Sequence, residues 1–201
     1  MLFWGLPQFL FLKIKGGKNM NGTISPVTGR YRQTALDFVE EVFAEYQNEK
    51  EGATVRRLVE EIRSGEYYLP KLELMMTDGQ GEIIGYVMFS RFPLEGKYAD
   101  ELLLLSPAAV KTELQRRHIS KELIEYGFDE AKKASFKAVL VEGDPMNYRS
   151  RGFRTSADFG IYADVSVKLP DVSCLMVKEL EEGALENIKG TVKYDIYDSL
   201  T

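Results

Sequence analysis

The chain has very few of the residues that carry cysteine and histidine chemistry. Its 201 residues include one cysteine, Cys174, and one histidine, His118. One cysteine cannot form an intrachain disulfide, and one residue of each kind cannot build a Cys/His zinc cluster. A serine or cysteine enzyme with a histidine base would have to use His118. We therefore expect no metal site, treat Cys174 as a small buried apolar residue, and expect a reduced, cytoplasmic setting.

The chain also lacks an excess of basic residues and a long apolar segment. It has 26 Lys and Arg against 31 Asp and Glu, a net charge of −5. Nucleic-acid binding usually needs a basic face, so we expect no nucleic-acid partner. Residues 1–12 are almost wholly apolar, but as a helix they would span only about 18 Å. We therefore expect no membrane span.

Residues 1–20 look like an addition to a single domain at 21–201, because the domain pattern starts just after Met20. The apolar run has no positive charge before it and no small-residue cleavage site after it, unlike a signal peptide. Three interpretations stay open: a translation start set too early, with Met20 as the true first residue; a segment that packs on a partner chain; and an anchor at a membrane surface.

Apolar periodicity in the first half predicts two helices and a β-hairpin. The first helix starts at Tyr31, and the second starts near Thr54, a suitable N-cap, and ends at Gly65. A turn at residues 78–81, Asp-Gly-Gln-Gly, predicts a hairpin over 71–90. A short strand is expected at Thr23–Val27.

The second half contains a strand, a long helix and another strand, at 101–106, 120–134 and 138–141. This order is typical of a βαβ unit, so the two strands should be parallel and adjacent. Four consecutive leucines suit a strand buried on both faces. Further strands are expected at 161–167, 174–177 and 190–194. The predicted fold class is α/β: a mixed (α+β) sheet of about six or seven strands flanked by helices.

Two basic loops without acidic residues should lie at one edge of this sheet. The first opens the long helix, and residues 114–121 hold Arg116, Arg117 and Lys121. The second follows the last parallel strand and has three arginines between Asp144 and Asp158. Helix N-termini and the carboxyl ends of parallel strands both bind anions and ligands. The pattern favours an anionic ligand such as a pyrophosphate.

These segments resemble the GNAT superfamily of N-acetyltransferases, most closely a bacterial branch with Gly-Asp-Pro after the fifth strand. Residues 85–90, Gly-Tyr-Val-Met-Phe-Ser, resemble the third strand, and 106–110, Ser-Pro-Ala-Ala-Val, resemble the splayed fourth strand. Residues 115–120 align with the pyrophosphate loop, Gln/Arg-x-x-Gly-x-Gly/Ala. Residues 143–153 match Gly-Asp-Pro…Tyr-x-x-x-Gly-Phe. The resemblance covers about 23–194.

The resemblance implies acetyl-coenzyme A as cosubstrate and transfer of its acetyl group to a primary amine. Pantetheine would bind the backbone of Ala108, Ala109 and Val110. The loop would hold the pyrophosphate through Gln115, Arg116, Arg117, His118, Ile119 and Ser120. The acceptor would be a small-molecule amine or a protein amine (an N-terminus or a lysine), and a homodimer is a further expectation.

The resemblance also implies catalytic roles for a few side chains. Tyr148 matches the tyrosine that protonates the leaving thiolate, and its alternative role is a packed aromatic. Glu142 and Glu101 are candidates for the base that deprotonates the amine, with Glu142 nearer the expected site. Their alternative is a solvated carboxylate, with water acting as base.

Two residues depart from the family pattern, because His118 and Ser120 replace small loop residues. Glycine there lets a backbone approach phosphate closely. The imidazole of His118 would either add charge or block the loop, and the Ser120 hydroxyl would donate to phosphate or cap the helix. The alternative function is therefore a catalytically degenerate GNAT-fold module for binding or regulation; an interaction protein that recruits a partner through residues 1–12 is a third.

Overall fold

A computed structural model describes residues 22–200 of the chain. The predicted extension at residues 1–20 lies outside the described part. The helices are α1 (Tyr31–Tyr46), α2 (Glu49–Ser64), α3 (Ile119–Lys133) and α4 (Pro145–Tyr148). The strands are β1 (Thr23–Pro26), β2 (Glu73–Thr77), β3 (Ile83–Arg91), β4 (Leu102–Val110), β5 (Ala138–Glu142), β6 (Arg154–Thr155), β7 (Ile161–Ala163), β8 (Leu175–Glu179) and β9 (Gly190–Val192).

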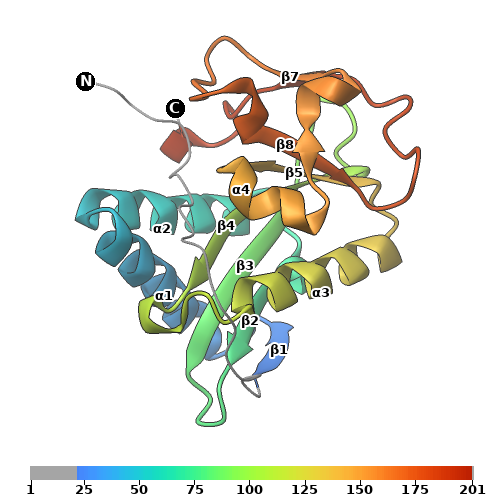
Figure 1. The fold of residues 1–201 in the computed structure, drawn as a ribbon. Helices are drawn as coiled ribbons and strands as arrows, with labels where there is room; N and C mark the ends of the chain where they lie inside the picture. The colour runs from blue at the N-terminus through green and yellow to red at the C-terminus, as the bar shows by residue number, and fades with distance from the viewer. Residues whose placement is uncertain (1–21, 201) are drawn as a thin grey trace.

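The main sheet has seven strands in the order β1-β2-β3-β4-β5-β8-β6. The β4–β5 pair is parallel and the other pairs are antiparallel. Helices α1 and α2 cover one face of the sheet, and α3 covers the other (Figure 1). The predicted mixed α/β class and the predicted parallel pair around α3 are therefore confirmed.

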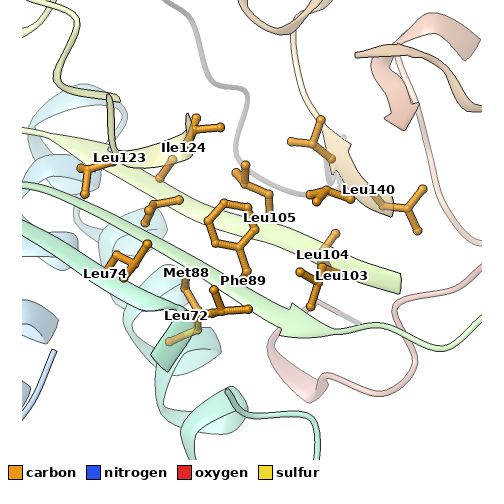
Figure 2. Close-up of a cluster of buried hydrophobic side chains, with 14 of the residues drawn as sticks. Leu72, Leu74, Met88, Phe89, Leu103, Leu104, Leu105, Leu123, Ile124 and Leu140 are labelled. Carbon is orange, nitrogen blue, oxygen red and sulfur yellow. The ribbon is translucent and has the colours of Figure 1, made fainter. Parts of the chain in front are cut away.

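The centre of the sheet is buried on both faces, as the four leucines predict. Leu102 through Leu105 are fully buried, and so are residues 138–141 of the neighbouring strand. Figure 2 shows side chains from both faces of β4 packing into this core. Burial on two sides explains why this segment shows a continuous apolar run instead of alternation.

Helix α3 presents its predicted apolar stripe to the sheet, with Ile119, Leu123, Ile124 and Phe128 buried. Gly127 lies in the same stripe and packs against Phe89 of β3. A Cβ atom added there would lie 2.2 Å from Cε2 of Phe89. The absence of a side chain at this position therefore lets the helix pack closely on the sheet.

The predicted start of the second helix is wrong by one and a half turns. Helix α2 begins at Glu49, and the side chain of Asn48 caps it by accepting a hydrogen bond of 3.1 Å from the Glu51 amide. Thr54 lies inside the helix and donates to the Lys50 carbonyl. Gly52 does not break the helix, because it packs against the Glu40 carbonyl of α1, where a Cβ would lie 2.5 Å away.

The C-terminal strands differ from the prediction in number and partner. Only three residues in each of the expected 161–167 and 190–194 strands are extended, and these form a separate two-stranded parallel sheet, β7–β9. The seventh strand of the main sheet is β6, a two-residue strand that the sequence pattern did not reveal. The segment that continues to Leu200 packs back onto α2.

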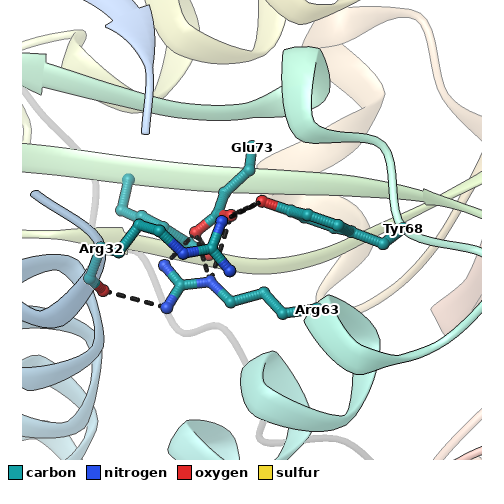
Figure 3. Close-up of polar contacts among 5 residues, drawn as sticks. Arg32, Arg63, Tyr68 and Glu73 are labelled. Carbon is teal, nitrogen blue, oxygen red and sulfur yellow. Dashed lines mark hydrogen bonds and ion pairs between the residues drawn. The ribbon is translucent and has the colours of Figure 1, made fainter. Parts of the chain in front are cut away.

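A buried ion pair joins the end of α2 to the start of β2. Glu73 is fully buried and forms a close ion pair with Arg63. The hydroxyls of Tyr68 and Tyr86 donate to the same carboxylate at 2.5 and 2.9 Å. Arg63 also donates to the Arg32 carbonyl, so the cluster ties α1, α2 and β2 together (Figure 3). Every carboxylate contact is charge-assisted, which offsets the desolvation of the pair.

Candidate active site

The site begins where β4 separates from β5. Only Leu102–Leu104 pair with Ala138–Leu140, although β4 continues to Val110. Ser106 and Pro107 both lie opposite the single residue Met88 of β3, which makes a β-bulge. A bulge bends its strand and ends pairing on one side. Beyond Leu104, the edge of β4 that faces β5 has no strand partner among residues 22–200.

The split exposes backbone groups that an extended ligand can use. Ala108, Ala109 and Val110 pair with β3 on one side, so alternate amide and carbonyl groups point to the other side. Their side chains are buried, which leaves the backbone as the part available for binding. Such an edge binds extended chains by adding one more row of hydrogen bonds.

The loop before α3 takes the backbone shape of a glycine loop without the glycines. Arg116 and His118 have φ angles of 69° and 65°, in the left-handed region that favours glycine. His118 is the N-cap residue, and no side chain caps the helix. The imidazole is exposed. The first amides of α3 therefore remain available to an anion even though histidine replaces glycine.

Arg151 joins the two loops that the sequence assigned to anion binding. Its guanidinium donates to the Ser120 hydroxyl at 3.2 Å and to the Asn147 carbonyl. Its Nε atom is buried without a hydrogen-bond partner in the described part of the chain. The expected sites did not include Arg151; the acid-free stretch of arginines was its only signal. Among the other expected loop residues, Gln115 is half-buried, Arg117 is exposed, and Ile119 is buried in the core.

Tyr148 ends the short helix α4 and is almost fully buried. Asp144 caps that helix by accepting from the Met146 amide at 2.9 Å. The Tyr148 ring packs edge-on against Phe153, and the Arg151 guanidinium lies 5.9 Å from its centroid. Burial raises the pKa of the Tyr148 phenol above its usual value. The phenol therefore keeps its proton at neutral pH, as a proton donor must.

Glu142 is the last residue of β5, two positions beyond the last β4–β5 pair, and is 5% exposed. Burial raises the pKa of its carboxyl to about 7, and the nearby Tyr194 hydroxyl partly offsets that rise. Its Oε2 atom has no hydrogen-bond partner among the described residues. A buried carboxyl that exchanges its proton near neutral pH is suited to general base chemistry.

The structure separates the two predicted candidates for the base. Glu101 precedes β4 at the end where that strand pairs with β5, and its carbonyl accepts from the amides of Lys137 and Ala138. Glu142 lies four residues beyond Ala138 along β5, which is about 13 Å at the rise of a strand. Only Glu142 lies at the split.

Tyr148 and Glu142 approach the split from opposite faces of the sheet. Tyr148 packs against Phe153, which in turn packs against Phe128 of α3. Glu142 lies on the same face as Leu140, and Leu140 pairs through Leu104 with Ser90. Since Ser90 contacts the C-terminal segment through Tyr197, Glu142 faces the α1 and α2 side. A reacting atom in the split would therefore lie between the two side chains.

Residues 22–200 contain neither a candidate metal cluster nor a candidate membrane span. This part of the chain contains no group of three or more His, Cys, Asp and Glu side chains that could hold a metal ion. It also contains no helix long and apolar enough to cross a membrane.

The sequence matches a family model and a relative from Escherichia coli. Residues 36–159, more than half of the chain, match the Acetyltransferase (GNAT) family. The chain is 29% identical over 139 residues to the uncharacterized N-acetyltransferase YhbS of Escherichia coli strain K12. That alignment covers 69% of this chain and 79% of YhbS.

The fold is similar to solved structures of acetyltransferases. The structure of YhbS from Escherichia coli in complex with CoA has a TM-score of 0.73 at 21% identity, covering 90% of this chain and 93% of that one. A GNAT acetyltransferase from Brucella melitensis in complex with acetyl-CoA has a TM-score of 0.54 at 22% identity, covering 68% and 84%. An aminoglycoside 6'-N-acetyltransferase complexed with coenzyme A has a TM-score of 0.57 at 14% identity, covering 79% and 97%.

Proposed function

Because this chain belongs to the GNAT family of acetyltransferases, we propose that it transfers the acetyl group of acetyl-coenzyme A to a primary amine. The observation that carries the proposal is the split between β4 and β5, which lies at the same sheet edge as the uncapped start of α3. An open strand edge beside an anion site suits a long ligand with a pyrophosphate at one end. YhbS, which has this fold, was solved with CoA.

The residues at the split fit acetyl-coenzyme A part by part. The backbone of Ala108 to Val110 would hold the pantetheine arm. The amides at the start of α3, with Ser120 and the Arg151 guanidinium, would hold the pyrophosphate. His118 leaves those amides accessible because its side chain is exposed and its backbone has the glycine-like shape. The bound cosubstrate supplies the thioester carbonyl that the amine attacks.

Glu142 and Tyr148 would manage the two protons of the reaction. Glu142 accepts the proton of the amine as the N–C bond forms, and Tyr148 gives its proton to the sulfur as the C–S bond breaks. The products are an N-acetylated amine and the free thiol, and both side chains then exchange protons with water. Glu142 must be ionised to act, so turnover should rise as the pH passes through about 7.

The test is acetyl transfer from acetyl-coenzyme A to a panel of small amines and amine-bearing peptides, with Tyr148→Phe as the variant. We expect Tyr148→Phe to lower kcat about 100-fold, because general acid catalysis contributes at least that much. Its affinity for acetyl-coenzyme A, measured by calorimetry, should stay within about twofold. Tyr126→Phe, which removes a hydroxyl from the exposed side of α3, serves as the matched control.

Two results would contradict the proposal in different ways. Unchanged turnover in Tyr148→Phe would remove Tyr148 as the acid and leave the transfer reaction standing. Tight binding of acetyl-coenzyme A with no acetylation of any amine would favour the non-catalytic binding module instead.

A further inference from the structure

The C-terminal segment brings a second buried polar group to Glu142. Tyr194 follows β9 and is 6% exposed, and its ring packs against Phe92 with centroids 5.8 Å apart. Its hydroxyl lies close enough to the Glu142 carboxyl to act on it directly. Within the described chain, however, both the Tyr194 hydroxyl and the Oε2 atom of Glu142 are buried without a hydrogen bond of normal geometry.

Buried polar atoms of two neighbouring side chains that both lack a hydrogen-bond partner are energetically costly. The cost is the desolvation of each atom, which no ligand or water repays while the position between them stays empty. A third group placed between them would satisfy both. An amine nitrogen suits this position, because it can donate to the carboxylate and accept from, or donate to, the phenol.

The position also suits the acceptor of the proposed reaction. Glu142 stands at the split, on the sheet face opposite the Tyr148 layer. Tyr194 and Tyr197 come from the same turn, and Tyr197 lies on this face too, where its hydroxyl pairs with Ser90 at 3.2 Å. The C-terminal segment that carries Tyr194 and Tyr197 lies beyond residue 159, where the family match ends. This side of the site therefore belongs to a part of the chain that the family model does not cover.

We propose that Tyr194 is a positioning residue whose hydroxyl holds the Glu142 carboxylate, and that the pair forms the binding point for the acceptor's primary amine. The proposal rests on the acetyl transfer proposed above. It assigns the acceptor side of the site to the C-terminal segment and the coenzyme side to the two basic loops.

Other titratable groups near Glu142 have different roles. Cys174 precedes β8, and its carbonyl accepts from the Gly143 amide; Asp144 caps α4. The Cys174 thiol lies near enough to the carboxyls of Glu142 and Asp144 to be influenced by both electrostatically, and neither Cys174 nor Asp144 is a cation. Burial keeps the pKa of the Tyr194 phenol well above its usual value, so Tyr194 stays protonated and acts as a hydrogen-bond donor.

The experiment compares the wild type, Tyr194→Phe and Tyr197→Phe in the full-length protein. Phenylalanine keeps the ring contact with Phe92 and removes only the hydroxyl. The Tyr197 variant is the matched control, because it loses a buried hydroxyl from the same turn that pairs with Ser90 instead. Two readouts are taken: the Glu142 titration by carbon-13 NMR of side-chain carboxyls, assigned with Glu142→Gln, and the pH profile of acetyl transfer.

We expect the Glu142 titration to move above about 7 in Tyr194→Phe, because the hydroxyl lowers that pKa in the wild type. The acidic limb of the kcat/KM profile should move with it. The loss of kcat at pH 6.5 should therefore recover at pH 9. KM for the amine should rise, and the Kd of acetyl-coenzyme A should stay unchanged. Tyr197→Phe should move neither the titration nor the limb.

An unmoved Glu142 titration in Tyr194→Phe overturns the proposal, and so does an equal movement in Tyr197→Phe. If the wild type acetylates no amine, the proposed function fails and the assignment of the amine fails with it. The NMR titration then still decides whether Tyr194 holds Glu142, so the two failures can be told apart.

Discussion

At the scale of single residues, His118 has a backbone conformation that its side chain disfavours. Its φ of 65° is a conformation that costs most side chains about 1–2 kcal/mol and costs glycine nothing. The surrounding loop holds this shape although the residue has a Cβ atom. The departure from glycine therefore changes what the loop exposes, while residue 118 keeps a backbone conformation that glycine favours.

We expect His118→Gly to change stability by no more than about 1 kcal/mol, because relief of the left-handed conformation offsets the greater freedom of glycine in the unfolded chain. Its informative readout is the Kd of acetyl-coenzyme A. Unchanged or weaker binding is expected, since the imidazole is exposed and does not cover the helix amides. Clearly tighter binding would show that the native histidine obstructs the loop.

At the scale of elements, the contact between α3 and β3 depends on the absence of one methyl group. Gly127 lies in the middle of a helix, where alanine would ordinarily gain about 1 kcal/mol. Here the added Cβ would lie 2.2 Å from Cε2 of Phe89, a buried ring that also packs edge-on against Phe128. Packing therefore outweighs helix propensity.

Gly127→Ala should lower the free energy of unfolding by about 1–3 kcal/mol in urea titrations, the usual cost of overpacking a core. The double variant Gly127→Ala with Phe89→Leu should lose less than the sum of the two single changes, because the smaller side chain leaves room for the methyl group. Additive losses would mean that the two residues do not share one contact.

Elements with strong periodicity could be predicted from the sequence, and elements made by tertiary contacts could not. The α3 stripe and the four leucines of β4 each carry a local signal. A helical apolar period indicates burial of one face, and a continuous apolar run indicates burial of both faces. β6 is two residues long and has no pattern of its own. The start of α2 was missed because Gly52 resembles a breaker, and its tight packing on α1 is visible only in three dimensions.

The same distinction holds for the site. The basic loops, Tyr148 and Glu142 follow strands and a helix whose ends can be placed from the sequence, so their position at one edge could be expected. Tyr194 is 52 positions beyond Glu142 and follows a three-residue strand in a separate sheet. No periodicity or spacing joins two such residues. Arg151 was visible as charge, but its link to Ser120 depends on how two loops fold together.

At the scale of the whole molecule, Glu142 makes stability depend on pH. Its pKa is about 7 in the folded protein and near 4.5 when unfolded, so the unfolded chain releases this proton first as the pH rises. The contribution of the protonated Glu142 carboxyl to stability is fully present below about pH 4.5, and it is lost as the pH rises through about 7. A shift of this size corresponds to about 3 kcal/mol.

Glu142→Gln removes this loss, so its free energy of unfolding should exceed that of the wild type by an increasing margin between pH 4.5 and pH 8. The margin should grow by about 3 kcal/mol across that range, measured by urea unfolding at each pH. Glu101→Gln, at the other end of the β4–β5 pair, controls for the loss of one acidic charge. A margin that stays constant with pH would contradict the assignment.

The position of the β4–β5 split has a consequence for how this molecule behaves among other proteins. An unpaired strand at the outer edge of a sheet can pair with strands of other protein chains, which extends the sheet and leads to aggregation. Here the unpaired edge lies in the middle of the strand order, because β5, β8 and β6 continue the sheet beyond it. A strand from another protein would need to enter between β4 and β5, within the sheet. A narrow ligand such as the pantetheine arm needs much less space there. The fold thus leaves an unpaired strand edge available to small ligands at a place where pairing with another protein chain is hindered.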